Sequence, residues 1–371
     1  MKYRKTPEDF IVEEIADHKV LKQGTHKLYT LEKESIETFA LLDMMSRENN
    51  IPRSEINIAG LKDTHAKTKQ YLTIPRNYNI KSLKNAKLTL VGYLNHALRL
   101  GDLDGNKFII TVKGIEKHEL SGILENSKSV NSGIPNYFDS QRFGNVIDGK
   151  FIGKLLVEKN YEQAVKQFLT GFSETDSDQR DEDKENIHNS WPEFNIKIHS
   201  FDLNKVVQTY KRTKKWIIAY KMITPALKQM FVSSYQSYLW NECIKTILKN
   251  SAPEEELSYV PYAVNELIFN KYELENIPEI FQTISHKINF LDSEEKIIKE
   301  VLDSEGLKIE NFNIRQTGNF FKSNERDVML YPKDFKMQEP ILDGDRYIIT
   351  VEFSLGRGSY ATMILKKIFG Q

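Results

Sequence analysis

The chain has 371 residues, which exceeds the size at which a single hydrophobic core usually stops growing, so we expect two compact bodies. Its 52 Lys and Arg residues balance its 52 Asp and Glu residues, which excludes a global attraction to nucleic acid or to membranes. The single cysteine, Cys243, excludes an internal disulfide and is typical of a reducing compartment, so we expect a cytoplasmic protein.

Several classes of protein find no support in the sequence. The start, MKYRKTPEDF, lacks the apolar run of a secretory signal, and no stretch approaches the length of a membrane-spanning helix. The eight histidines form no close-spaced pair, and neither Cys-x-x-Cys nor a glycine-rich nucleotide-binding motif occurs. We therefore expect no membrane contact, no bound metal and no cofactor.

The first elements in chain order are a strand and a helix. Residues 26–33 (HKLYTLEK) alternate as a half-buried strand does, and residues 35–50 carry a helical pattern with Ser35 as the expected N-cap. Residues 67–72 alternate again and predict a strand with a cationic face. Residues 107–114 (KFIITVKG) predict a further strand.

The second half of the chain begins with a different pattern. Residues 173–190 (SETDSDQRDEDKENIHNS) are strongly acidic and lack apolar periodicity, which predicts a mobile surface loop that repels RNA. Residues 226–250, preceded by Pro225, predict a long and well-buried helix. Residues 346–355 predict a last strand. Strands near both chain ends indicate one α+β body made of the first and last parts, with a helix-richer segment inserted between them.

A basic and aromatic cluster lies at residues 210–216 (YKRTKKW). Its cations suit RNA phosphates and its rings suit stacking on bases, but the same composition is equally typical of a solvated helix face. The candidate RNA-binding residues here are Lys211, Arg212, Lys214 and Lys215.

One acid stands among several bases in the stretch AGLKDTHAKTKQY, residues 59–71. Asp63 precedes the predicted strand 67–72, and Lys62, Lys67 and Lys69 surround it in sequence. Nearby cations favour the ionised form of a carboxylate, which suits it to act as a base, a nucleophile or an electrostatic partner. A mixed charge run of this kind is more often only a solvated loop.

A second candidate stretch is IPNYFDSQRFGN, residues 134–145. Asn136 and Phe138 stand there beside further aromatic rings, an amide and a guanidinium. Rings that stack and polar groups that bind a base edge are the chemistry that holds an unstacked base, although such a run taken alone is more typical of a packed loop.

Together these stretches resemble the motifs of the TruD family of tRNA pseudouridine synthases, in that family's order. The resemblance covers nearly the whole chain. It rests on PEDFIVEE (7–14), AGLKDTHAKTKQ (59–70), LRLGDLDGNKFIITV (98–112), IPNYFDSQRFG (134–144), SSYQSYLWN (233–241) and FSLGRGSYAT (353–362).

The resemblance implies a fold and a division into domains. The fold is α+β: a pseudouridine synthase catalytic domain with a mixed, mainly antiparallel sheet, plus an inserted α/β TRUD domain. We place the discontinuous catalytic domain at residues 1–145 and 316–371 and the inserted domain at residues 146–315.

The resemblance also implies roles for individual residues. Asp63 matches the catalytic aspartate, Phe138 the ring that stacks on the target uracil, and Asn136 a polar organiser of the same pocket. Phe10 would line that pocket, and Arg4 stands where the family has a basic residue that could pair with the aspartate. Phosphate contacts are expected from Lys62, Lys67 and Lys69 and from the cations of residues 211–215.

The chain departs from the family pattern in a few places. Asp139 stands where glycine is usual, LGRGSYAT lacks a proline that is common after the leucine, and Lys366 and Lys367 stand where arginine and glutamate are frequent. None of these changes removes a proposed catalytic group. They leave open the backbone geometry near Asp139 and the local contacts to RNA.

The implied reaction isomerises uridine to pseudouridine in tRNA, at position thirteen by family expectation, without a cofactor. The carboxylate could attack ribose C1′ or remove the C2′ proton, and the sequence leaves both routes open. Two other hypotheses stay open, a non-catalytic RNA-binding protein with the same fold and, more distantly, a metal-dependent nuclease. We expect tRNA as the partner, a monomer, and no obligatory protein partner.

Overall fold

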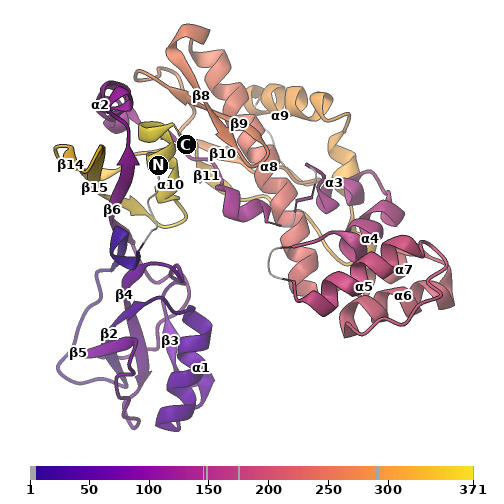
Figure 1. The fold of residues 1–371 in the computed structure, drawn as a ribbon, viewed down its shortest axis with the longest axis horizontal. Coiled ribbons are helices and arrows are strands. Elements are labelled where there is room, and N and C mark those ends of the chain that lie inside the picture. The colour runs from indigo at the N-terminus through magenta and orange to yellow at the C-terminus, as the bar shows by residue number, and fades with distance from the viewer. Residues whose placement is uncertain (1–5, 145, 148, 174–175, 289–291, 371) are drawn as a thin grey trace. The chain divides into compact units, whose positions relative to one another are not determined.

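The chain forms two compact units. The structure is a computed structural model that describes residues 6–144, 146–147, 149–173, 176–288 and 292–370. The first unit comprises Met1–Ile134 and Leu330–Gln371, and the second comprises Pro135–Met329. These divisions differ from the predicted domain boundaries at 145/146 and 315/316, and the assignment of a catalytic and an inserted TRUD domain stays a prediction. Figure 1 shows the elements of both units.

The first unit is built on one large sheet. In the described part of the chain it has nine strands, in the order β13-β15-β6-β1-β4-β2-β5, with β14 paired to β15 and β3 to β4. Among the described strand pairs of this sheet, only β1 and β4 run parallel. The bounds are β1 (Phe10–Ile15), β2 (His26–Glu34), α1 (Thr38–Asn49), β3 (Asn57–Ile58), β4 (Lys67–Pro75), β5 (Ala86–Leu94), β6 (Gly105–Ile115), α2 (Leu120–Lys128), β13 (Lys333–Met337), β14 (Ile341–Asp343), β15 (Arg346–Gly356) and α10 (Ala361–Phe369).

The sheet confirms the α+β prediction and the expectation that the two ends of the chain meet. Strands β6 and β15, more than two hundred residues apart, pair antiparallel with Val351 opposite Ile110. The alternation of buried and part-exposed residues on both strands follows the period of two read from the sequence. The strands expected at 26–33, 107–114 and 346–355 are all present.

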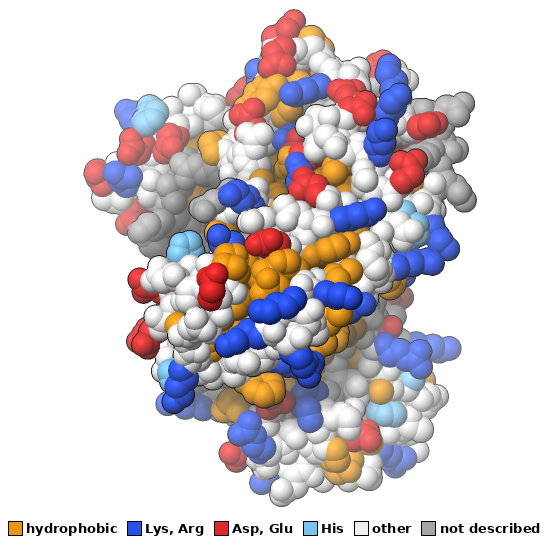
Figure 2. All heavy atoms as spheres, turned by 90° about the vertical axis from the view of Figure 1, so that its right-hand side faces the viewer, with side chains coloured by type: hydrophobic (Ala, Val, Ile, Leu, Met, Phe, Trp, Pro, Cys, Tyr) orange, Lys and Arg blue, Asp and Glu red, His pale blue; other side chains and the backbone are white. Residues whose placement is uncertain are grey.

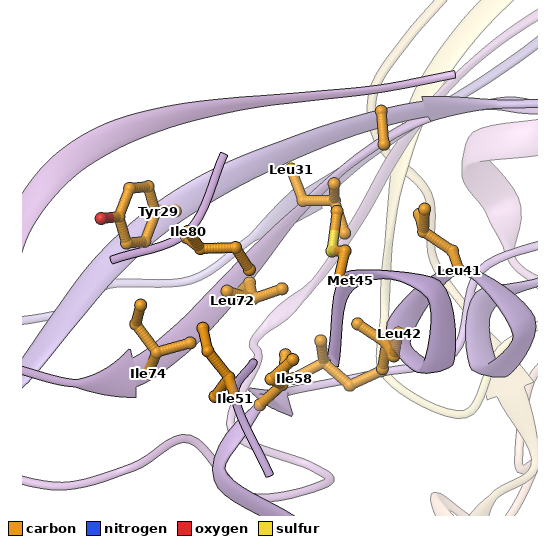
Figure 3. Packing of buried hydrophobic residues seen from close by; sticks show 12 residues of the cluster. Tyr29, Leu31, Leu41, Leu42, Met45, Ile51, Ile58, Leu72, Ile74 and Ile80 are labelled. Atoms are coloured by element: carbon orange, nitrogen blue, oxygen red, sulfur yellow. The ribbon is translucent and has the colours of Figure 1, made fainter. Parts of the chain in front are cut away.

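Helix α1 covers one face of the β2 and β4 end of this sheet. Leu41 and Met45 of α1 pack against Leu31 of β2 and Leu72 of β4, and all four are fully buried (Figure 3). Each such aliphatic side chain contributes about 1.5 to 3 kcal/mol by leaving water. This packing fixes the face of the sheet on which the loop that carries Asp63 is held.

The expected N-cap of this helix was wrong. Helix α1 begins at Thr38, and the Glu37 carboxylate caps it by accepting from Ala40 N at 2.6 Å. Ser35 has a left-handed backbone (φ 51°), and the Ile36 carbonyl accepts a hydrogen bond from Lys33 Nζ at 2.8 Å. A side chain from the preceding strand therefore holds the chain here, and the helix starts only after that contact.

The second unit is mainly helical, with short two-stranded sheets. The bounds are α3 (Ile152–Val157), α4 (Tyr161–Thr170), α5 (Asp178–Asn189), α6 (Phe201–Thr213), α7 (Trp216–Lys221), α8 (Pro225–Ser251), β8 (Leu257–Tyr262), β9 (Asn265–Asn270), β10 (Ile280–Gln282), α9 (Asp292–Ser304) and β11 (Glu325–Asp327). The strands β7 (Ile134–Pro135) and β12 (Met329–Leu330) mark the division between the units. Helix α8 confirms the predicted buried helix, with Pro225 in its first turn and Cys243 buried.

The acidic stretch 173–190 is not a loop throughout, which corrects the prediction. Residues Asp178–Asn189 form helix α5, and Asp183, Lys184 and Ile187 are buried. Asp183 accepts hydrogen bonds from the backbone of His199 at 3.0 Å and of Ser200 at 2.6 Å, and Lys184 pairs with Asp176 at 2.5 Å. Buried ionic contacts hold this helix, and a search for apolar periodicity cannot detect such contacts.

Among the residues that the structure describes, no helix is long and apolar enough to cross a membrane.

Candidate functional site

Side chains from neighbouring elements bind the main chain of the loop that carries Asp63. Lys33 Nζ donates to the Asp63 carbonyl at 2.9 Å. Thr38 Oγ1 donates to the Lys62 carbonyl at 3.1 Å and accepts from Lys62 N at 3.4 Å. Gln70 Nε2 donates to the Gly60 carbonyl at 3.2 Å. Three side chains, from β2, α1 and β4, thus fix the backbone of residues 60–63 on the α1 side of the sheet.

The carboxylate of Asp63 itself is part-exposed at the end of this loop. Its Oδ1 accepts a hydrogen bond from His65 N at 3.0 Å, which orients the side chain over the turn into β4. The structure therefore confirms that Asp63 lies on the loop that leads into the strand 67–75. An acid held this way is presented from a rigid support, as proximity catalysis requires.

The ammonium group of Lys33 is the charge most closely tied to this loop. Lys33 is 2% exposed, and burial lowers its pKa, while the charges of Asp63 and Glu37 oppose that shift. Its ammonium group donates hydrogen bonds to the backbone carbonyls of Ile36 and Asp63. The residue was absent from the sequence-based candidates because it lies thirty positions before Asp63, and only strand pairing brings the two together.

Lys62 departs from its predicted role as a phosphate contact. Its ammonium group pairs with the Glu14 carboxylate at 2.5 Å, and the two side chains are 4% and 0% exposed. The other Glu14 oxygen accepts from Tyr71 N at 3.2 Å. A charge buried this deeply needs its partner, so Lys62 supports the loop from beneath and its ammonium group does not face solvent.

Lys67 and Lys69 also lie differently from expectation. Both are exposed on β4, as the alternation predicted, but Thr68 and Gln70 occupy the buried face that supports the Asp63 loop. The two lysines therefore project from the opposite face of the sheet. There Glu34 and Glu32 of β2 stand across from them, and Glu13 of β1 is in register with Lys69. This alternating pattern of charge does not support a basic track leading to Asp63.

Of the two remaining candidates in the first unit, Phe10 is described and Arg4 lies outside the described residues. Phe10 is 3% exposed at the start of β1, opposite Ile110, and meets the Phe108 ring edge-on at 6.3 Å between centroids. The structure thus places Phe10 in the hydrophobic core of the sheet. Its role in a uracil pocket stays a prediction.

Asn136 and Phe138 are brought together in the second unit. Asn136 Oδ1 accepts from an Arg326 Nη2 at 3.2 Å, and the Arg326 guanidinium carbon lies 4.0 Å from the centre of the Phe138 ring. The same guanidinium is 5.2 Å from the Trp240 ring. Asn136 thus orients an arginine that stacks on Phe138, which makes this cluster a planar, cationic and aromatic surface.

The backbone beside Phe138 is equally well fixed. Asn241 of α8 accepts from Phe138 N at 2.8 Å and donates to the Phe138 carbonyl at 3.0 Å, and Trp240 Nε1 donates to the Asn136 carbonyl at 2.9 Å. Trp240 and Asn241 end the motif SSYQSYLWN, so their sequence signal was visible without a role. Arg326, in NERDVML, had no such signal and is found only through β11.

The change from glycine to Asp139 does not disturb this geometry. Asp139 has φ −83° and ψ 167°, an extended backbone that any residue adopts, and it precedes a short 3-10 turn over Ser140–Phe143. The backbone at Asp139 therefore does not require a glycine.

The aromatic rings of the cluster at 210–216 stack on other rings of the second unit. Trp216 stacks on Tyr210 at 3.4 Å and on Trp191 at 4.9 Å, so both faces of its ring are covered. Lys214 lies over Tyr210 and Lys166 over Trp191, each 5.5 Å from the ring centroid. The three rings are half-buried and stack on one another, which does not favour a stacking platform for RNA bases built on Tyr210 and Trp216.

The cations of the cluster remain at the surface. Lys211, Arg212, Lys214 and Lys215 are exposed, and Lys211 Nζ donates weakly to the Phe194 carbonyl at 3.4 Å. Figure 2 shows Lys and Arg side chains beside apolar ones, with acidic side chains interspersed, on the face that it displays. The predicted phosphate contacts by these four residues stay a prediction.

No three His, Cys, Asp or Glu side chains within the described ranges gather as a possible metal site.

Comparisons with known proteins agree with the motif order. The family model described as "tRNA pseudouridine synthase D (TruD)" matches residues 1–368. A protein of Methanocaldococcus jannaschii, named probable tRNA pseudouridine synthase D 2, is 40% identical over all of this chain and 92% of its own. Probable tRNA pseudouridine synthase D 1 of Methanococcus maripaludis is 37% identical over 100% and 99%.

A solved structure shares the fold. The crystal structure of the putative tRNA pseudouridine synthase D from Methanosarcina mazei superposes with a TM-score of 0.74, covering 99% of this chain and 93% of that one, at 24% identity. This likeness confirms the fold class expected from the sequence.

Proposed function

Since the chain belongs to the TruD family of tRNA pseudouridine synthases, which are isomerases, we propose that it converts uridine to pseudouridine in tRNA at position thirteen, with Asp63 as its catalytic residue. The observation that carries the assignment is the support of the Asp63 loop. Buried side chains from β2, α1 and β4 bind three main-chain positions between Gly60 and Asp63. A solvated charge run would have no need of such anchoring.

The chemistry breaks the bond between ribose C1′ and uracil N1, turns the base, joins C1′ to C5 and removes the C5 proton, while N1 gains a proton, so that the product is an isomer of uridine. Asp63 acts as a carboxylate, either attacking C1′ or removing the C2′ proton, and both routes use the same oxygen atoms of this side chain. No electrons are gained or lost overall, so the reaction is assigned no cofactor.

The target uridine has to leave its stack, which costs a few kcal/mol. We assign Phe138 as the ring that receives the uracil, because an aromatic platform returns about 1 to 3 kcal/mol per base. The Phe138 ring is 8% exposed with Arg326 4.0 Å from its centre, so this role requires Arg326 to move aside. Arg326, which Asn136 orients at 3.2 Å, adds a cation 4.0 Å from the centre of that ring. tRNA as the substrate also favours a cytoplasmic location, and we propose a monomer as the working form.

The test uses tRNA labelled in its uridines, incubated with the native protein, with Asp63→Asn, and with Asp43→Asn as the matched control. Asp43 is a surface aspartate of α1 that pairs with Arg53 at 3.2 Å, so the same chemical change leaves the site untouched. We expect pseudouridine from the native protein and the control only, with equal tRNA binding by all three. Product from Asp63→Asn would remove the assigned role.

Two further arms decide the alternatives. Binding without product from any form would favour a non-catalytic RNA-binding protein, and cleaved tRNA that disappears with chelator would favour a nuclease. A tRNA with cytidine at position thirteen should yield no product, and undiminished product from it would overturn the assigned position.

A further inference from the structure

A hollow of about 980 Å³ lies in the first unit and has no part in the function proposed so far. Its walls come from the connection between β1 and β2 (residues 16–21), from residues 94–104 between β5 and β6, and from Arg357 after β15. Three cations line it, Lys19, Arg99 and Arg357, and all three are exposed. Its volume lies at the upper end of the range for pockets that bind small ligands.

Arg357 and Arg99 differ in how their guanidinium groups are held. Arg357 Nη1 donates to the Gly101 carbonyl at 3.2 Å, which fixes the guanidinium at the rim while its other donors stay available. The Arg99 guanidinium has no hydrogen bond or ion pair with any described residue, and Asp102 accepts from its backbone N at 2.7 Å. A planar guanidinium suits phosphate oxygens, which it binds with two parallel hydrogen bonds.

The hollow also has acidic and aromatic walls. Asp104 accepts from Asp17 N at 2.9 Å, so Asp104 and Asp102 each use an oxygen to hold a turn. His18 packs edge-on against Tyr71 at 4.8 Å, and its Nε2 is buried with no hydrogen-bond partner among the described residues. Because this nitrogen is buried, a ligand in the hollow reaches it only after the His18 ring rotates.

The negative charges of three aspartates balance the positive charges of the three cations, so an inorganic anion would bind weakly. The aspartates are Asp17, Asp102 and Asp104. A nucleotide fits better, because its phosphate needs cations while its ribose hydroxyls and base amino groups need acceptors such as Asp17. His96 and the apolar side chain of Leu103 supply surface for a base, while Leu94, 2% exposed, belongs to the buried floor.

The hollow adjoins the loop that carries Asp63. Gly101 N donates to the Ala59 carbonyl at 2.8 Å, and Leu103 Cδ2 lies 3.7 Å from where a Cβ on Gly60 would stand. We propose that this hollow binds one nucleotide of the substrate RNA, other than the target uridine, with Arg99 and Arg357 on its phosphate and His18 and Asp17 on its base or ribose. The assignment rests on the proposed function, since it takes RNA as the ligand.

The experiment measures binding of fluorescent tRNA in the Asp63→Asn background, so that turnover plays no part. Arg99→Ala and Arg357→Ala are compared with Arg76→Ala, an exposed arginine after β4 whose side chain contacts no described residue by hydrogen bond or ion pair. We expect each hollow variant to bind about tenfold more weakly, with the slope of log K against log salt reduced by about one, and the control to bind unchanged.

Equal affinities for all three variants would overturn the proposal. A second arm titrates uridine, guanosine and adenosine monophosphates and follows His18 and His96 by NMR. Histidine shifts that saturate, and that tRNA suppresses by competition, support a site for a nucleotide of the RNA. Shifts that tRNA leaves unchanged would mean a site for a free nucleotide and would overturn it. Failure of the proposed function would appear separately, as native protein that forms no pseudouridine.

Discussion

Lys33 Nζ bonds the main-chain carbonyl of Asp63 at 2.9 Å and that of Ile36 at 2.8 Å. One buried ammonium group thus joins β2, the start of α1 and the loop that carries the proposed catalytic acid. Lys33 touches backbone only in these two contacts, so we regard it as a positioning residue.

Replacing Lys33 with Met should lower kcat by about 10- to 100-fold, since a displacement near 1 Å at a reacting group costs about that much. Binding of tRNA, measured in the Asp63→Asn background, should stay the same. Lys33→Arg should restore part of the rate, because it can still donate to both carbonyls. The control is Lys87→Met on β5, whose lysine side chain is 71% exposed. A native kcat for Lys33→Met would remove the positioning role.

Phe138→Leu should separate stacking from packing. Leucine fills most of the space, so the free energy of unfolding should change by less than about 1.5 kcal/mol, but the flat ring that receives a base is lost. We expect single-turnover rates to fall about 5- to 150-fold, which corresponds to the 1 to 3 kcal/mol of a stacked base. If the variant reacts at the native rate, the ring does not receive the uracil.

Glu14→Gln should destabilise the first unit. It leaves the ammonium group of Lys62, 4% exposed, without its carboxylate partner at 2.5 Å. Loss of one partner from a buried pair costs about 3 to 5 kcal/mol. Urea denaturation should show this loss, and the double variant Glu14→Gln with Lys62→Met should recover part of it. Unchanged unfolding would mean that Lys62 finds solvent easily and remains available to RNA.

Trp216→Ala should destabilise the second unit by about 1 to 3 kcal/mol, less than truncation of a fully buried aromatic, because Trp216 is half-buried. The ring is held between Tyr210 and Trp191, so its loss removes two stacked contacts. Affinity for tRNA, measured at a temperature where the variant is folded, should not change. A tRNA affinity that falls while the melting temperature stays native would restore Trp216 as a base-stacking residue.

Lys367 predicts a pH dependence of stability. Burial lowers its pKa to about 8 from the ordinary 10.5, so between these values the unfolded chain binds more protons and the free energy of unfolding rises with pH. The rise reaches about 3 kcal/mol at most. Below pH 8 both states are charged and the full cost of burying the charge remains.

Lys367→Met should therefore stabilise the protein at pH 7, by about 1 to 3 kcal/mol, and should abolish the rise above pH 8. Denaturation at several pH values checks this, with exposed Lys128→Met as the control. A variant less stable than the native protein at pH 7 would show that the ammonium group has partners that stabilise it.

The local elements could be predicted because their signals are short-range. The spacing of apolar residues predicted the strand at residues 107–114 and the helix after Pro225. The order of the motifs identified the family and the loop of Asp63. In each case the pattern depends on residues within a few positions of one another, where strand alternation and helical spacing act directly.

The roles of the charged residues were decided by tertiary structure. Lys62, Lys67 and Lys69, which are close to Asp63 in sequence, were predicted to contact RNA phosphates beside it. In the folded sheet, Lys67 and Lys69 lie on the opposite face, and Lys62 is buried against Glu14. The acidic stretch became helix α5 because distant backbone groups at His199 and Ser200 bind Asp183. Local sequence patterns indicated several of the strands and helices, and the motif order indicated the family, but helix α5 was not among them. Contacts between segments far apart in the chain decide which charged side chains are exposed and which form ion pairs. Those contacts exist only after folding.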